Sequence, residues 1–145
     1  MNNAFTPFIP MKTKEDIDPA PGSSYRFIIP SNTLIVVQCL KALFQADANA
    51  ADRFIQLQFC DPSGVPYLTS PLSPAITAGE SYFIYVADFP AVYYDPVNFF
   101  IHIPFPFQFQ FPSLYQLILQ VYNIQANDTI LKPTLSYFEV PFNTD

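Results

Sequence analysis

The 145-residue sequence predicts an all-β protein: a single β-sandwich or jelly-roll-like domain with an extended N-terminal arm. Two observations carry this prediction. Short apolar segments alternate with turn residues along the chain, which is typical of a sandwich or jelly roll and not of an α/β fold. Sixteen prolines against three glycines indicate loops that are stiffened at the ends of strands.

The first segment, residues 1–24, is expected to be the extended arm. It carries the charged run "KTKEDID" and four prolines, and its apolar residues follow no period. Prolines favour extended backbone in themselves and in the residue before them. Phe5, Phe8 and Ile9 are apolar enough to dock on a partner, and a floppy terminus is the alternative. Residues 25–145 are expected to form the sandwich.

The strands of the sandwich are expected where apolar and β-branched residues gather. They are "YRFIIP", "TLIVVQCLKALF", "RFIQLQFC", "VPYLTS", "SYFIYVAD", "NFFIHI", "YQLILQVYNI" and "TLSYFEV". Two of them alternate, which predicts that one side of each faces the core: Ile55, Leu57 and Phe59 in the first, and Tyr115, Leu117, Leu119 and Val121 in the second.

Turns are expected between these strands. "QADANAAD" is predicted to be a loop with room for one helical turn, since its alanines favour helix and its Asp and Asn residues favour turns. "DPSG" has the proline and glycine positions of a type I turn. "PLSPAITAGE" is expected to end in a turn at Ala78 and Gly79.

The segment "PFPFQFQFP", residues 104–112, places phenylalanine at every second position. Phe105, Phe107, Phe109 and Phe111 would therefore lie on one side of an extended segment. Its prolines lack an N–H and prevent full pairing on both edges. Two interpretations stay open. Either the phenylalanines cap the core from an edge strand, or they dock on a neighbouring subunit.

Charge is scarce and its balance is acidic. Charged residues make up 12% of the chain, against about 25% in ordinary soluble domains. So few charges cover a surface thinly, which predicts that partner proteins cover part of it. The net charge of −6 and six scattered basic residues argue against nucleic acid as a partner. The longest apolar segment is too short for a membrane helix, so we expect no membrane partner.

The residues that would carry chemistry are too few for an enzyme, a cofactor or a metal site. His102 stands alone among apolar residues and is interpreted as structural. Cys39 and Cys60 are expected to be free thiols. One histidine and two distant cysteines cannot build a zinc cage. The candidate paired carboxylates lie in turn contexts, where Asp bonds its own backbone: Asp47, Asp52 and Asp61.

Three segments carry a family resemblance: "RFIQLQFCDPSG", "SPAITAGESYFIYV" and "YQLILQVYNIQANDTI". They contain an Arg-led strand that enters a D-x-S-G turn, a Ser/Ala/Gly loop before an aromatic strand, and a strand that ends in an I-x-A-x-D turn. With these, roughly residues 25 to 140 resemble small β-sandwich structural proteins of tailed bacteriophage virions.

The resemblance implies a viral structural protein without enzymatic activity. It would be located in the virion, assembled in the host cytoplasm, and act as a capsid decoration or cement protein or as a tail accessory protein. Its partners would be its own copies, with a trimer favoured, and the major capsid protein or another virion protein. A receptor- or carbohydrate-binding sandwich is the alternative. The hypothesis for partner binding names Phe5, Phe8, Ile9, Phe105, Phe107, Phe109 and Phe111.

Overall fold

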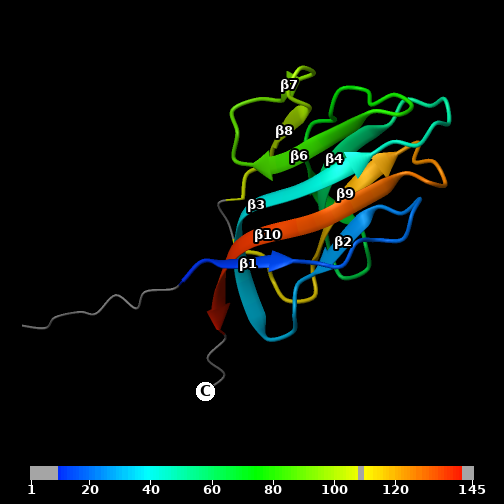
Figure 1. Cartoon of the computed structure of the whole chain (residues 1–145). Coiled ribbons are helices and arrows are strands. Elements are labelled where there is room, and N and C mark those ends of the chain that lie inside the picture. Colours follow the sequence, from blue (N-terminus) through cyan, green and yellow to red (C-terminus); the bar gives the residue numbers. More distant parts are fainter. Residues whose placement is uncertain (1–9, 108–109, 142–145) are drawn as a thin grey trace, which may run out of the picture.

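The computed structural model describes residues 10–107 and 110–141, and these form an all-β sandwich of ten strands in two sheets (Figure 1). The predicted fold class is confirmed. The strands are β1 (Lys12–Glu15), β2 (Tyr25–Ile28), β3 (Thr33–Gln45), β4 (Phe54–Cys60), β5 (Pro66–Thr69), β6 (Ser81–Ala87), β7 (Tyr93–Asp95), β8 (Phe100–Pro104), β9 (Gln116–Tyr122) and β10 (Thr129–Pro141).

The two sheets have unequal size. One has the strand order β1-β10-β3-β6-β8-β7 and the other has the order β2-β9-β4-β5 (Figure 1). Four antiparallel pairs are nested in the sequence: β4 with β5, β3 with β6, β2 with β9, and β1 with β10. β7 and β8 extend the larger sheet beyond β6, and β8 runs parallel to β6. Eight of the ten described strands thus form four nested pairs, and β7 and β8 are added to the larger sheet.

The core lies between the sheets and follows the predicted alternation. Ile55, Leu57 and Phe59 of β4 are buried, as are Leu117, Leu119 and Val121 of β9. From the larger sheet, β6 and β8 contribute buried side chains at every second position: Tyr82, Ile84, Val86, Ile101 and Ile103. Side chains at the intervening positions of these strands lie on the outer face of their sheet, which is the face turned away from the other sheet.

The long strands β3 and β10 do not keep one alternation throughout. Their pairing shifts register between Leu131 and Thr134 and again between Ser136 and Tyr137. A shift of this kind inserts extra residues in one strand and bends it. β10 is thus an irregular strand, and its first irregularity places Lys132 on the outer face of the larger sheet.

The described part of the expected arm is attached to the sandwich. β1 lies inside residues 1–24 and pairs with β10 at the edge of the larger sheet. The Tyr25 hydroxyl donates a hydrogen bond to Asp16 Oδ2 over 2.8 Å, and the Lys132 N–H donates one to Asp18 Oδ1 over 2.7 Å. Residue 24 therefore marks no break in the sheet, and the chain from β1 onward belongs to it.

The turns follow their sequence patterns except at one loop. In "DPSG" the Gly64 N–H donates to the Asp61 carbonyl over 2.9 Å, which closes the predicted turn. The helical turn expected in "QADANAAD" is absent, since residues 46–52 hold only bends and irregular backbone. The carboxylate of Asp47 accepts the Asn49 N–H there and pairs with Arg53, so side-chain bonds replace the helical ones.

Candidate functional site

Three of the phenylalanines predicted to bind a partner lie in the core of the molecule. Phe105, Phe107 and Phe111 are 1%, 2% and 0% exposed. The rings of Phe105 and Phe107 have centroids 4.8 Å apart, and Phe111 meets Phe59 edge-on at 4.8 Å. The row is also not a continuous strand, because the Phe107 N–H turns back to the Phe105 carbonyl. In this structure the three rings offer no surface to a neighbour.

The remaining residues of that hypothesis are Phe5, Phe8, Ile9 and Phe109, and they lie outside the described residues. Their role in partner binding stays a prediction.

The outer faces of the two sheets differ in chemistry. On the smaller sheet, side chains of β4 and β9 bond to one another: the Tyr122 hydroxyl donates to Gln56 Oε1 over 2.8 Å and accepts from Gln58 Nε2 over 3.0 Å. Over β4 and β9 this face is therefore polar and its groups already have partners, while Ile28 is exposed on the edge strand β2. The larger sheet instead presents aromatic rings.

The aromatic patch on the outer face of the larger sheet spans β6, β8, β7 and the loop after β6. It consists of Phe83, Tyr85, Phe89, Tyr93, Phe100 and His102. Phe83 is 45% exposed and Tyr93 is 54% exposed. Exposed aromatic groups at this density are uncommon on soluble monomers unless a partner covers them.

His102 is the centre of the aromatic patch. Its ring stacks on Phe89 with centroids 4.6 Å apart and an interplanar angle of 11°. Tyr85 meets the imidazole edge-on at 5.6 Å, and Tyr93 lies 5.5 Å away on its other side. The predicted structural role of this histidine corresponds to ring packing on a face that is half open to solvent.

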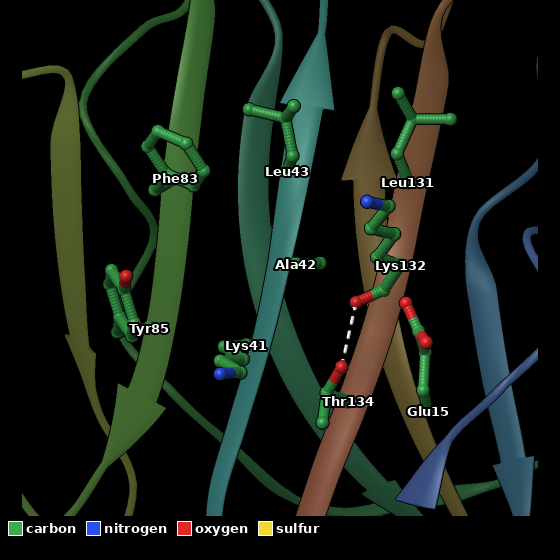
Figure 2. Close-up of a pocket in the computed structure, with 9 residues that line it drawn as sticks. All are labelled: Glu15, Lys41, Ala42, Leu43, Phe83, Tyr85, Leu131, Lys132 and Thr134. Carbon is green, nitrogen blue, oxygen red and sulfur yellow. Dashed lines mark hydrogen bonds between the residues drawn. The ribbon is translucent and has the colours of Figure 1, made fainter.

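A hollow of about 540 Å³ lies beside the aromatic patch, over β6, β3 and β10 (Figure 2). Phe83 and Tyr85 of β6 form one wall and β10 forms the other, as Figure 2 shows. The hollow is lined by Glu15, Lys41, Ala42, Leu43, Phe83, Tyr85, Leu131, Lys132 and Thr134. Its volume falls within the range of small-molecule sites, roughly 300–1,000 Å³.

The irregularity of β10 shapes the wall of the hollow. Lys132 has φ 51°, a left-handed conformation that costs a residue with a side chain about 1–2 kcal/mol. Asp18 holds the Lys132 N–H, the Asp16 N–H donates to the Pro133 carbonyl over 2.8 Å, and the Thr134 hydroxyl donates to the Lys132 carbonyl over 2.9 Å (Figure 2). Strained backbone that its neighbours hold in place is frequent at binding sites.

A buried ion-pair network ties together one end of the sandwich. Arg53 and Asp128 are both fully buried, and Arg53 Nε donates to Asp128 Oδ2 over 2.9 Å. Arg53 Nη2 also donates to Asp47 Oδ1 over 2.7 Å, and Nη1 donates to the Ala51 carbonyl. The network joins the loop before β4 to the loop before β10. Its donors and acceptors bond one another, so we interpret it as structural.

The charge of Asp128 is stabilised by this network. Burial would raise the pKa of the carboxyl, but hydrogen bonds from Arg53 and from the Asp47 and Gln125 N–H groups, together with the Arg53 charge, hold the pKa below its usual range.

Other predicted chemistry-bearing residues are dispersed. Both cysteines are free thiols, Cys39 half-buried and Cys60 buried. Asp61 caps its own turn by accepting the N–H groups of Ser63 and Val65. Within residues 10–107 and 110–141, no cluster of three metal-ligating side chains occurs. The same residues contain no helix with the length and hydropathy to cross a bilayer.

Sequence reasoning missed both the aromatic patch and the buried network. The signal for the patch is present in "SYFIYVAD" and "NFFIHI", where apolar side chains occupy both faces of a strand. Such strands are usually covered on both sides. The network had a weaker signal in the sequence: Arg53 directly before β4 and Asp128 at the end of the I-x-A-x-D turn.

Comparison of the chain with known proteins finds no match: no family model, no curated protein and no solved structure matches it.

Proposed function

We propose that the protein is a non-enzymatic structural protein of a virus particle, of the capsid decoration or cement type. It binds a shell protein and its own copies through the outer face of the larger sheet. The observation that carries this proposal is the aromatic patch, because rings such as Phe83 and Tyr93 need a cover in water.

The sparse charge supports the same proposal. With 12% charged residues, the chain has few groups that would keep an aromatic face soluble and unpartnered. Over β4 and β9, the outer face of the smaller sheet has Gln and Tyr groups that bond one another, so this part is suited to face solvent.

The nested strand pairs also support it. We infer that the sandwich is a jelly roll, since its eight principal strands pair first with eighth, second with seventh, third with sixth and fourth with fifth. Jelly rolls occur in viral capsid domains and in lectins. Because one fold serves many functions, the likeness to capsid jelly rolls supports the proposal only together with the aromatic patch.

Sedimentation of purified variants tests the proposal. Phe83→Ser with Tyr93→Ser should convert an associated species at micromolar concentration into a monomer. Ile28→Ser is the matched control, since Ile28 is 52% exposed on the smaller sheet and should leave association unchanged. A wild-type protein that stays monomeric and has no affinity for an assembled shell would sink the proposal. A trimer is the expected assembly on the family resemblance alone.

A second candidate function is favoured by the hollow. A receptor- or carbohydrate-binding sandwich needs an aromatic wall beside convergent polar groups. Phe83 and Tyr85 face Lys132 and Thr134 across the hollow in this arrangement (Figure 2).

A further inference from the structure

The hollow holds two cationic groups, Lys41 and Lys132, beside one carboxylate, Glu15. Of the six basic residues in the chain, Lys12 and Arg53 form ion pairs. Lys41 and Lys132 both line the hollow, and neither forms an ion pair within the described part of the chain. The charged residues that line the hollow, Lys41, Lys132 and Glu15, sum to +1 in a protein of net charge −6, which gives a local positive potential. This favours an anionic group in the hollow.

The hollow also has acceptors without donors. The Glu15 carboxylate can only accept hydrogen bonds, and it makes none within the described residues. The Thr134 hydroxyl donates its hydrogen to the Lys132 carbonyl, so towards a ligand the hydroxyl oxygen can act only as an acceptor. A ligand that fits these groups must carry hydroxyl or amide donors in addition to its negative charge.

The third feature of the hollow is its apolar wall. Phe83 and Tyr85 stand on β6, with Leu43 of β3 and Leu131 of β10 across from them (Figure 2). Aromatic faces bind the C–H side of a ligand by burial of apolar surface. The ligand must therefore combine an anion, hydroxyl donors and an apolar face within one small unit.

We propose that the hollow binds an acidic sugar, a uronic or sialic acid unit of a glycan, with its carboxylate on Lys41 and Lys132, its hydroxyls on Glu15 and Thr134, and its ring against Phe83 and Tyr85. The proposal rests on the second candidate function and names its ligand class. The hydrogen bonds that Asp18 and Asp16 make to Lys132 and Pro133 hold this part of the β10 backbone in position in the absence of a ligand.

Amide chemical shifts in a titration test the proposal. The probes are methyl glycosides of glucuronic, galacturonic and N-acetylneuraminic acid, with the neutral methyl glucoside and galactoside as matched partners. Benzoate serves as an anion with an aromatic ring and no hydroxyls. At least one acidic glycoside should shift the amides of Leu43, Phe83 and Leu131 and bind about 5-fold more tightly than its neutral partner, as one exposed ion pair allows.

Variants assign the selectivity to the two lysines. Lys41→Gln and Lys132→Asn should each reduce affinity for the acidic glycoside by about 5-fold and leave the neutral one unchanged. Asn is chosen at position 132 because it tolerates the left-handed backbone. Arg26→Gln is the control, an exposed base on β2 of the other sheet, and it should change nothing. Thermal unfolding confirms that each variant is folded.

The outcomes separate the two levels of the proposal. If acidic and neutral glycosides bind equally well and neither lysine variant changes their affinity, the hypothesis of an acidic ligand is wrong, while carbohydrate binding is retained. Absence of binding for every glycoside overturns both. Benzoate that binds as tightly as the best acidic glycoside overturns the assignment to a sugar.

Discussion

At the scale of single residues, Arg53 and Asp128 depend on one another. Each is fully buried, and each supplies the other with a compensating charge and hydrogen bonds. Removal of Asp128 leaves the buried Arg53 with Asp47 as its remaining ionic partner and takes away the acceptor of its Nε and one of the two acceptors of its Nη2, which costs more than an exposed ion pair contributes.

Asp128→Asn should therefore lower the free energy of unfolding by about 3–5 kcal/mol, measured by urea denaturation. Asp52→Asn is the matched control: it removes an exposed carboxylate from the neighbouring loop and should change stability by less than about 0.5 kcal/mol. Equal effects of the two substitutions would contradict a structural role for the buried pair.

The Asp128 carboxyl should also make the free energy of unfolding depend on pH in the acid range. The pKa of Asp128 is lower in the folded state than the unfolded value of about 3.9, so the native state favours the charged form. Its contribution is complete above the unfolded pKa and is lost as the pH falls through the folded pKa.

The difference in unfolding free energy between wild type and Asp128→Asn should stay constant from neutral pH to about pH 5 and shrink below it. Three other carboxyls also have lowered pKa values, but their contributions cancel in this difference because both proteins contain them: Asp61, Glu80 and Asp95. A difference that stays constant through the acid range would refute the assignment to Asp128.

At the scale of strands and segments, the described phenylalanines of residues 105–111 act as part of the core. Phe107→Ala should lower the free energy of unfolding by about 3–5 kcal/mol, as the loss of a buried aromatic side chain does. Phe83→Ala removes the same atoms from the outer face and should cost the monomer about 1 kcal/mol or less. Urea denaturation of dilute protein measures both, and a similar cost for the two would contradict the placement of Phe107.

The edge strand β1 gives a second prediction at this scale. Deletion of residues 1–24 removes β1 and the Asp16 and Asp18 bonds to Tyr25 and Lys132. Each hydrogen bond contributes about 0.5–1.5 kcal/mol, so the truncated protein should unfold cooperatively at a lower temperature. Calorimetry that shows no cooperative transition would place β1 within the indispensable core.

Strands with a regular period were predictable, and those with an irregular one were not. The alternation in β4 and β9 gave the correct buried face because each strand faces the core along its whole length. β10 changes face at Lys132 and Pro133, and the cause is its pairing with β1 and β3, which no local pattern contains. The Phe row shows the same limit, since its period predicted one shared side but not the turn at Pro106.

At the scale of the whole molecule, the candidate site comes from neighbours that are distant in sequence. β6, β3 and β10 meet in one sheet, and Lys41 then lies opposite Tyr85 on one side and Thr134 on the other. Composition alone predicted that partners cover part of the surface, which stays a prediction, and the sheet order places the aromatic patch on one face. Sequence reasoning could not choose between the two faces, because the choice follows from strand pairing.

The nested pairs of strands have a consequence for how the protein forms. Closing a pair costs entropy that grows with the length of chain between its members, and β4 with β5 is the most local of the four nested pairs. Once that hairpin exists, less flexible chain separates β3 from β6, so their pairing costs less entropy. Each outer pair is made less costly in the same way by the pair inside it. β1 must wait for β10, so on the ribosome the first of the described strands to be synthesised belongs to the last of the four pairs to form. Until β10 is made, the edge of β3 where β10 pairs stays open, and the nascent sheet has an exposed edge to protect.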